Sequence, residues 1–215
     1  MQVVAVPVKA LPQSKSRLAS VLTGSERAAL TLAQLDDVLG ACVGQAGWET
    51  WVVSPDPVVL EAAGARGARP VRDERGSLLG AVRQIEAMLP DPFDVLAVVL
   101  GDLPYVTAAD IRAALDTDGP VVAAPAASDG GTNLLLRRPA SVIPAKFGRA
   151  SFDRHRWEAS RRGIELVEVR APGLEEDLDR PGDLARLIAR SHRSRTRSVC
   201  LEMGLARRLW SLDRA

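Results

Sequence analysis

The residues from Val95 to Pro104, VLAVVLGDLP, decide the fold class of this chain. An uninterrupted apolar run leads directly into Gly101 and Asp102 before the chain reaches the proline. Such a run is what a strand needs when helices cover both of its faces, as in the centre of a parallel sheet. Ligands of these sheets bind at the carboxyl ends of the strands, where Asp102 would lie. A carboxylate at the rim of an apolar core favours a cation as its partner, although a polar turn explains the same two residues equally well.

Strand and helix patterns alternate on both sides of this stretch. Predicted strands cover residues 3–8, 48–54, 70–71, 95–100, 120–125, 132–138 and 164–169, and predicted helices begin near residues 25, 58, 78, 108, 151 and 182. Four repeats of strand and helix before residue 126 predict an α/β fold with a mostly parallel sheet and helices on both faces. The pattern weakens after residue 126, where we expect an antiparallel addition at the edge of the sheet.

Length and composition bound the class of protein. A chain of 215 residues with 47% hydrophobic and 26% charged residues is typical of one globular domain, which we place at residues 1–190. Residues 191–215 form an arginine-rich C-terminal extension of unknown role. A net charge of +1 argues against a nucleic-acid binder, and no apolar stretch is long enough for a membrane span. Two isolated cysteines favour a reducing cytoplasm.

Two polar segments have the composition of phosphate-binding loops. Lys9, Lys15 and Arg17 follow the first predicted strand, and flexible cations of this kind can bind phosphate oxygens. A solvated basic loop is the simpler explanation of the same residues. The segment 128–133, SDGGTN, combines two glycines with the Thr132 hydroxyl, which together could close on an anion. A hairpin turn explains this segment almost as well.

Two further segments carry carboxylates or helix-entrance donors. Asp177 and Asp179 alternate, so on an extended segment both would face one way and favour a shared Mg²⁺. The alternative is an acidic loop before a helix, with Asp183 interacting with the helix dipole. In the segment 146–155, KFGRASFDRH, Gly148 and Ser151 could donate to a phosphate at a helix start. Arg149, Arg154 and His155 would supply charge nearby, and Ser151 as a plain N-cap is the structural alternative.

Taken together, these segments indicate phosphate chemistry assisted by a metal ion. Carboxylates with metal-binding character and cationic or glycine-rich phosphate sites lie on one α/β scaffold. This is the equipment for attack by one phosphate on another, with Mg²⁺ holding the transferred group and pyrophosphate leaving.

The same segments, in their order and spacing, resemble a known family, the guanylyltransferases of coenzyme F420 biosynthesis. These enzymes act on 2-phospho-L-lactate or phosphoenolpyruvate and are related to the molybdenum-cofactor guanylyltransferase. The resemblance covers roughly residues 3 to 190. The segments that carry it are Val6–Lys9, Lys15–Ala19, Gly101–Pro104, Gly131–Asn133, Phe147–Gly148, Ser151–Phe152, Arg154–His155, Asp177–Asp179, Pro181 and Asp183–Leu184.

The resemblance implies a Rossmann-like nucleotidyltransferase that joins GMP from GTP to a phosphorylated three-carbon acid. It implies that Mg²⁺ is held by Asp102, Asp177 and Asp179. It also implies that the acid is bound by Thr132, Gly148 and Ser151, and the nucleotide by Lys9, Lys15 and Arg17. The acceptor phosphate is already an anionic nucleophile, so the reaction needs positioning and charge neutralisation rather than a general base.

Some points stay open at the level of sequence. The family usually has an asparagine where this chain has Leu79, within Gly76–Gly80, which puts a nucleotide contact in question. The acceptor could be phosphoenolpyruvate or 2-phospho-L-lactate. The excess of arginine over lysine is typical of GC-rich coding and favours a bacterial source, for which we expect phosphoenolpyruvate. The alternatives are a nucleotidyltransferase for another phosphorylated small acid or a molybdopterin, and a catalytically silent nucleotide-binding protein. We expect no nucleic-acid or membrane partner, and a homodimer is a possible assembly.

Overall fold

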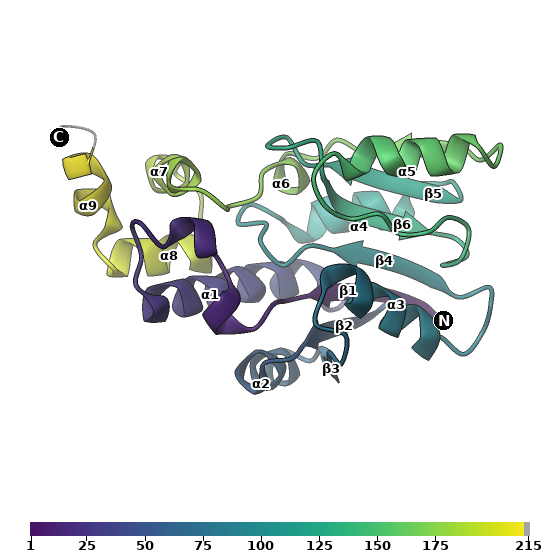
Figure 1. The fold of residues 1–215 in the computed structure, drawn as a ribbon, viewed down its shortest axis with the longest axis horizontal. Helices are drawn as coiled ribbons and strands as arrows, with labels where there is room; N and C mark the ends of the chain where they lie inside the picture. The colour runs from purple at the N-terminus through teal and green to yellow at the C-terminus, as the bar shows by residue number, and fades with distance from the viewer. Residues whose placement is uncertain (213–215) are drawn as a thin grey trace.

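A seven-stranded sheet in the order β3-β2-β1-β4-β6-β5-β7 forms the centre of the molecule (Figure 1). The computed structural model describes residues 1–212. The strands are β1 Gln2–Pro7, β2 Glu49–Ser54, β3 Arg69–Arg72, β4 Val95–Val99, β5 Val121–Pro125, β6 Thr132–Arg137 and β7 Leu166–Glu168. Neighbouring strands run parallel except at β6, which is antiparallel to both β4 and β5.

Helices cover both faces of this sheet. They are α1 Gly24–Cys42, α2 Pro57–Ala65, α3 Leu78–Met88, α4 Ala108–Asp116, α5 Ser151–Ser160, α6 Pro172–Glu175, α7 Pro181–Ala189, α8 Arg195–Glu202 and α9 Leu205–Leu212, with 3₁₀ turns η1 Leu11–Gln13 and η2 Ser16–Leu18. Within residues 1–212, no helix has the length and apolar character that crossing a membrane requires.

The strands are buried on both faces, as their apolar runs predict. In β1, Val4 and Val6 enter a core with residues of α1, α2 and α4, whereas Val3 and Ala5 enter a second core with residues of α3 and α5. The central stretch divides in the same way between the two cores along β4. The predicted α/β class, the mostly parallel sheet and the helices on both faces are therefore confirmed. Helix α4 opens with a capping box, in which Thr107 and Asp110 are bonded to each other reciprocally.

The predicted antiparallel strand is present, but its expected place at the sheet edge was wrong. Strand β6 lies inside the sheet, between β4 and β5. Its residues Leu134, Leu135 and Leu136 are fully buried, because both faces of this strand are covered. The edges are formed by β3 and β7, which are shorter and more exposed. This insertion matters for the site described below.

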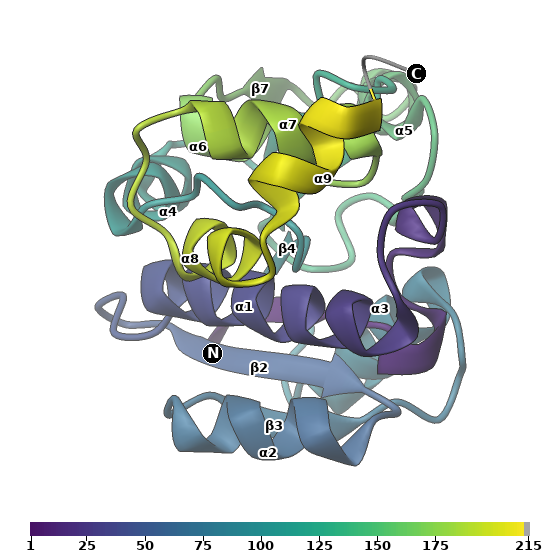
Figure 2. The same cartoon turned by 90° about the vertical axis from the view of Figure 1, so that its left-hand side faces the viewer.

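The described part of the C-terminal extension packs on the domain rather than leaving it. Helix α8 lies along α1, and α9 follows it toward α7 (Figure 2). Both carboxylate oxygens of Asp37 in α1 accept backbone N–H groups at the start of α8, from Arg195 at 2.7 Å and from Thr196 at 2.8 Å. Cys200 and Leu205 enter a third apolar core with the loop residue Leu18.

Candidate active site

The candidate site lies where the strand order reverses. The chain places β2 on one side of β1 and β4 on the other, so the carboxyl ends of β1 and β4 flank a topological switch point. Open α/β sheets bind ligands at such points because the two following loops diverge and leave a crevice. Here the loops are the segment with Lys9, Lys15 and Arg17 after β1 and the Gly101-Asp102 pair after β4.

Lys15 is the cation that ties these loops together. Its side chain is only 7% exposed, and its Nζ lies 3.0 Å from Asp102 Oδ2 and 2.5 Å from the carbonyl oxygen of Leu178. The Leu178 N–H in turn donates to the Asp102 carbonyl at 3.1 Å. The amine therefore joins the end of β4 to the acidic segment. Gln34 of α1 adds a contact that the sequence prediction missed, because its Nε2 donates to the same Asp102 carbonyl at 3.3 Å.

Two of the three predicted metal carboxylates have the character that a metal ligand needs. One oxygen of Asp102 and one of Asp177, Oδ1 in each case, are buried and have no hydrogen-bond partner. The pKa of the Asp177 carboxyl is raised above its ordinary value by burial and by the negative charge of Asp102. Unpaired carboxylate oxygens that repel each other suit a hard divalent cation such as Mg²⁺. The two side chains therefore fit the ion.

Asp179, the third predicted metal carboxylate, has a cation of the protein as its partner. It forms an ion pair with Arg17, from the loop after β1. Among residues 1–212, no three His, Cys, Asp or Glu side chains form a group that could hold a metal ion. The simpler interpretation of this segment also holds in part, because Asp183 accepts the N–H groups of Asp179 and Arg180 at the start of α7.

The predicted acceptor residues are brought together around one buried pair of hydroxyls. Ser151 Oγ donates to Thr132 Oγ1 at 3.0 Å, and the Ser151 N–H donates to the Gly148 carbonyl at 3.0 Å. Gly148 is exposed and has a φ of 122°, which side-chain-bearing residues rarely adopt. The three residues thus belong to one local structure at the start of α5 and β6.

The reversed direction of β6 places this structure beside the carboxylates. Val99 of β4 pairs with Leu134, and the Leu100 N–H donates to the Asn133 carbonyl at 2.9 Å. The amino end of β6 therefore lies next to the carboxyl end of β4. Thr132 is the first residue of β6, and Asp102 follows the end of β4. If β6 ran parallel to β4, Thr132 would instead lie beside the amino end of β4, at the opposite end of the strands.

Three expectations about this region were wrong. Ser151 is not an N-cap, because Ala150 occupies that position with a φ of 52° and Ser151 is the first helical residue. His155 does not supply charge, because burial, reinforced by the positive charges of Arg137 and Arg154, lowers its pKa to about 4. The Gly131 N–H is not available to an anion, because it donates to Asp129 at 2.8 Å.

Asn133 is a buried polar residue whose contact the sequence did not specify. Its Nδ2 donates to the Leu174 carbonyl of α6 at 2.8 Å, and the Glu175 carbonyl accepts the Ala127 N–H at 2.9 Å. These bonds fix α6, and with it the acidic segment that follows, on the ends of β5 and β6. An amide beside the apolar run 134–136 is a signal for such a role, since a buried amide must find partners.

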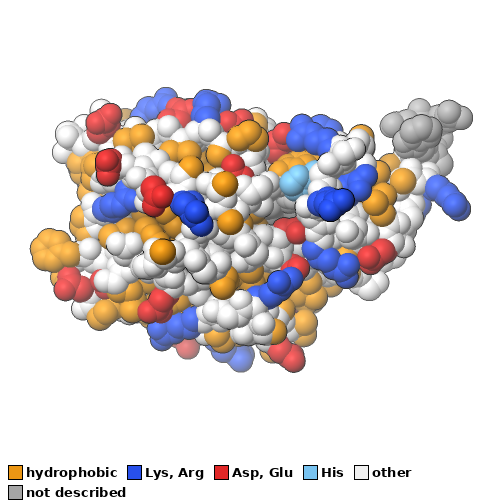
Figure 3. Space-filling view, turned by 180° about the vertical axis from the view of Figure 1, so that it is seen from behind, with side chains coloured by type: hydrophobic (Ala, Val, Ile, Leu, Met, Phe, Trp, Pro, Cys, Tyr) orange, Lys and Arg blue, Asp and Glu red, His pale blue; other side chains and the backbone are white. Residues whose placement is uncertain are grey.

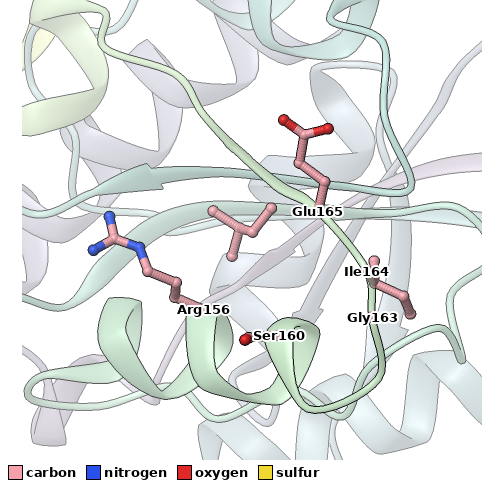
Figure 4. A pocket seen from close by; sticks show the side chains of 6 residues that line it. Arg156, Ser160, Gly163, Ile164 and Glu165 are labelled. Carbon is pink, nitrogen blue, oxygen red and sulfur yellow. The ribbon is translucent and has the colours of Figure 1, made fainter.

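The remaining candidates lie outside these contacts. Lys9 is exposed and forms no ion pair with any residue of 1–209. Leu79 packs, partly buried, against the core between the sheet and α3. A cavity of about 360 Å³ lies between Arg156 of α5 and the segment 163–166, at the β7 side of the sheet (Figure 4). Its lining contains none of the candidate residues.

Comparisons with known proteins identify the family. The family model described as Guanylyl transferase CofC like matches residues 1–207. A phosphoenolpyruvate guanylyltransferase of Rubrobacter xylanophilus is 41% identical over 188 residues, covering 86% of this chain and 92% of the relative. A 3-phospho-D-glycerate guanylyltransferase of Phenylobacterium zucineum is 36% identical, with coverages of 88% and 91%. A 2-phospho-L-lactate guanylyltransferase of Methanothermobacter thermautotrophicus is 34% identical, with coverages of 85% and 82%.

A solved structure agrees on the fold. A protein from Desulfovibrio desulfuricans, described as a candidate nucleotide-diphospho-sugar transferase, matches with a TM-score of 0.78 at 19% identity and 97% coverage of both chains. At that identity the likeness concerns the fold alone. The family model, in contrast, covers nearly the whole sequence, and the curated relatives share more than a third of their aligned residues with it. This chain belongs to the CofC-like guanylyl transferase family.

Proposed function

We propose that this chain transfers GMP from GTP to a phosphorylated three-carbon acid and releases pyrophosphate, the step that makes the activated intermediate of coenzyme F420. The observation that carries the proposal is the joining of Lys15, Asp102 and the acidic segment at the switch point of the sheet. Family membership supports guanylyl transfer as the reaction. The curated relatives are named for three phosphorylated three-carbon acids, which supports that class of acceptor.

The ion pairs of the candidate site indicate how the nucleotide would be bound. Lys15 is paired with Asp102, and Arg17 with Asp179. Each pair joins a residue suited to phosphate with a residue suited to a cation. In our proposal the carboxylates of Asp102 and Asp177 would hold Mg²⁺, and Lys15 and Arg17 would bind the triphosphate of GTP. Bound Mg²⁺ would supply neutralisation of the charge that develops on the leaving pyrophosphate.

The transfer itself needs little proton chemistry from the protein. A phosphate oxygen of the acceptor forms a bond to the α-phosphorus of GTP, and the bond from that phosphorus to the bridging oxygen of the β-phosphate breaks. The attacking phosphate is already an anion, so no proton has to leave it. The task of Thr132, Gly148 and Ser151 would be to hold the acceptor in line with the leaving group. The closeness of the ends of β4 and β6 supports this arrangement.

Among the acceptors, phosphoenolpyruvate is the first expectation, because the relative with 41% identity carries that name. The Phenylobacterium relative makes 3-phospho-D-glycerate the second candidate. All three acids present a phosphate and a carboxylate, so the same hydroxyl and backbone donors could serve each. Leu79 stands where the family usually has an asparagine, so we propose that guanine is selected by other contacts.

The proposal includes a cytoplasmic location without a nucleic-acid partner. Cys42 and Cys200 are both free and buried, and cysteines without a disulfide support a reducing compartment. Positive and negative side chains alternate over the face seen in Figure 3, with no extended basic area on it. This mixture favours small charged ligands over a nucleic-acid backbone.

The decisive experiment measures pyrophosphate release with Mg²⁺ and GTP. Separate reactions receive phosphoenolpyruvate, 2-phospho-L-lactate, 3-phospho-D-glycerate or no acceptor, and CTP and ATP replace GTP in parallel. We expect release with GTP and with one acid above the others, and none without an acceptor. Asp102→Asn should abolish release while the circular dichroism spectrum stays unchanged. GTP binding without release for any acid would instead identify a silent nucleotide-binding protein or an enzyme for another acceptor.

A further inference from the structure

A buried chain of hydrogen bonds runs behind the candidate acceptor site. The Lys146 N–H donates to His155 Nε2 at 2.8 Å, and His155 Nδ1 lies 3.0 Å from Thr132 Oγ1. Ser151 Oγ donates to the same Thr132 oxygen at 3.0 Å. His155 and Ser151 are fully buried and Thr132 is 2% exposed, so water does not compete for these bonds.

The direction of the first bond fixes the state of the imidazole ring. A backbone N–H can only donate, so Nε2 of His155 must be the accepting, unprotonated nitrogen. In a neutral ring the single proton is then on Nδ1, which donates to Thr132 Oγ1. The ring is neutral near pH 7, because burial first, then the positive charges of Arg137, Arg154 and Lys146, lower its pKa to about 4 against the opposing effect of Glu158.

The ring state in turn fixes the direction of the Thr132 hydroxyl. A hydroxyl oxygen has two lone pairs and one proton. Both lone pairs of Thr132 Oγ1 are used, by His155 and by Ser151. Thr132 Oγ1 then donates to no side chain or carbonyl of residues 1–209, so its proton is left without a partner in the protein. With the proton on Nε2 instead, Thr132 would donate to the ring and turn a lone pair toward the ligand.

We propose that His155 is a positioning residue that makes Thr132 an obligatory hydrogen-bond donor to an anionic oxygen of the acceptor. The inference rests on the proposed function, in which Thr132 contacts the phosphorylated acid. An anion is attracted by the free proton and repelled by a lone pair, so the ring sets the charge preference of this part of the site without touching the ligand. Removal of the N–H donor of His155 should therefore weaken binding of the acceptor acid and leave binding of GTP unchanged.

Two amide substitutions separate this role from packing. In His155→Asn the side-chain amide can place its N–H near the Nδ1 position and still donate to Thr132. In His155→Gln the longer side chain can place its carbonyl near the Nε2 position, accept from Lys146 and offer no donor to Thr132. Both variants lose the edge-to-face contact of the ring with Phe147, at 5.5 Å between centroids, so the loss of this contact is common to both.

Steady-state kinetics then give the first test. We expect His155→Gln to raise the KM for the acceptor by about tenfold or more, the effect of a lost hydrogen bond to a charged group. His155→Asn should stay within about threefold of the wild type, with the KM for GTP unchanged in both. A purely structural residue would affect the two variants alike, and equal changes, or a larger change in His155→Asn, would overturn the proposal.

The second test needs neither activity nor a variant of His155. Nitrogen-15 NMR of the wild-type protein reports which ring nitrogen carries the proton, and the chain has only two histidines, so His192→Gln assigns the signals. We expect a neutral ring with the proton on Nδ1 at pH 7. A proton on Nε2, or a cationic ring, would overturn the inference. Because this readout is independent of pyrophosphate release, it separates failure of the inference from failure of the proposed function.

Discussion

Replacement of Lys15 by methionine tests the centre of the candidate site most directly. Methionine keeps much of the length and apolar volume of the side chain and removes the amine that bonds Asp102 and the Leu178 carbonyl. The negative charge of Asp102 then faces that of Asp177 without the nearby cation. Lys15 is also one of the groups that lower the pKa of Asp177, so this pKa should rise further in the variant.

The expected loss of stability follows from the distance and the exposure. Two opposite charges 3.0 Å apart attract by about 5.5 kcal/mol at an effective dielectric constant of 20, and by about 1.4 kcal/mol in water. Lys15 is nearly buried but Asp102 is 29% exposed, so the interaction lies between these limits. Removal of the amine also relieves its own desolvation, which offsets part of the loss. We expect Lys15→Met to lower the free energy of unfolding by about 1–3 kcal/mol.

Urea denaturation at pH 7, with and without Mg²⁺, measures this loss. Lys9→Met is the matched control, because Lys9 lies in the same loop and is exposed, without an ion pair in residues 1–209. The control should differ from the wild type by less than about 0.5 kcal/mol. Mg²⁺ should stabilise Lys15→Met more than the wild type, since the carboxylates then lack the amine. A loss below about 0.5 kcal/mol in Lys15→Met would refute the assignment of this ion pair.

Three further predictions concern the surroundings of the site. The pKa of His155 is lowered from 6.5 to about 4, so as the pH falls the unfolded chain binds a proton before the folded protein does. Between pH 7 and pH 5, the free energy of unfolding measured with urea should fall by about 2 kcal/mol more in the wild type than in His155→Asn, and equal falls would contradict the buried neutral ring. Asp37→Ala removes the acceptor of the first N–H groups of α8 and should lower the free energy of unfolding in urea by about 1–2 kcal/mol. An unchanged urea midpoint would contradict this role of Asp37. Gly173→Ala would place a methyl group 2.3 Å from a carboxylate oxygen of Asp110 in α4 and should lower the free energy of unfolding by about 1–3 kcal/mol. The control Gly64→Ala, which has open space around the new methyl group, should not lower it.

The fold class could be predicted because the strands carry local signals. The apolar run before Asp102 and the strand–helix alternation are properties of short segments, and burial on both faces requires them. The position of β6 was missed although its signal was present. Leu134, Leu135 and Leu136 form an uninterrupted apolar run of the same kind as β4, which favours an interior strand over an edge strand. The antiparallel direction was anticipated, and the place in the sheet should have followed from the burial pattern.

The candidate site was less accessible to sequence reasoning, because its properties depend on pairs from distant segments. Two ion pairs hold the site together, Lys15 with Asp102 and Arg17 with Asp179. Each of these residues lies in a segment that, taken alone, has the sequence of a solvated loop. The assumption that Asp177 and Asp179 share one face rested on strand geometry, and that segment is neither helix nor strand. His155 was grouped with the cations because nothing in the neighbouring residues reveals that a helix and a strand bury it.

The third apolar core gives the C-terminal helices a physical connection to the site. This core joins Leu18, which follows Lys15 and Arg17, to Leu178, which lies between Asp177 and Asp179. Cys200 of α8 and Leu205 of α9 belong to the same core. Each of the two site loops contributes a buried leucine to this core. Leu18 and Leu178 are both buried in the core that contains residues of the C-terminal helices. These helices therefore fix the loop with the cations relative to the loop with the carboxylates, although the sequence alone predicts only an extension of unknown role.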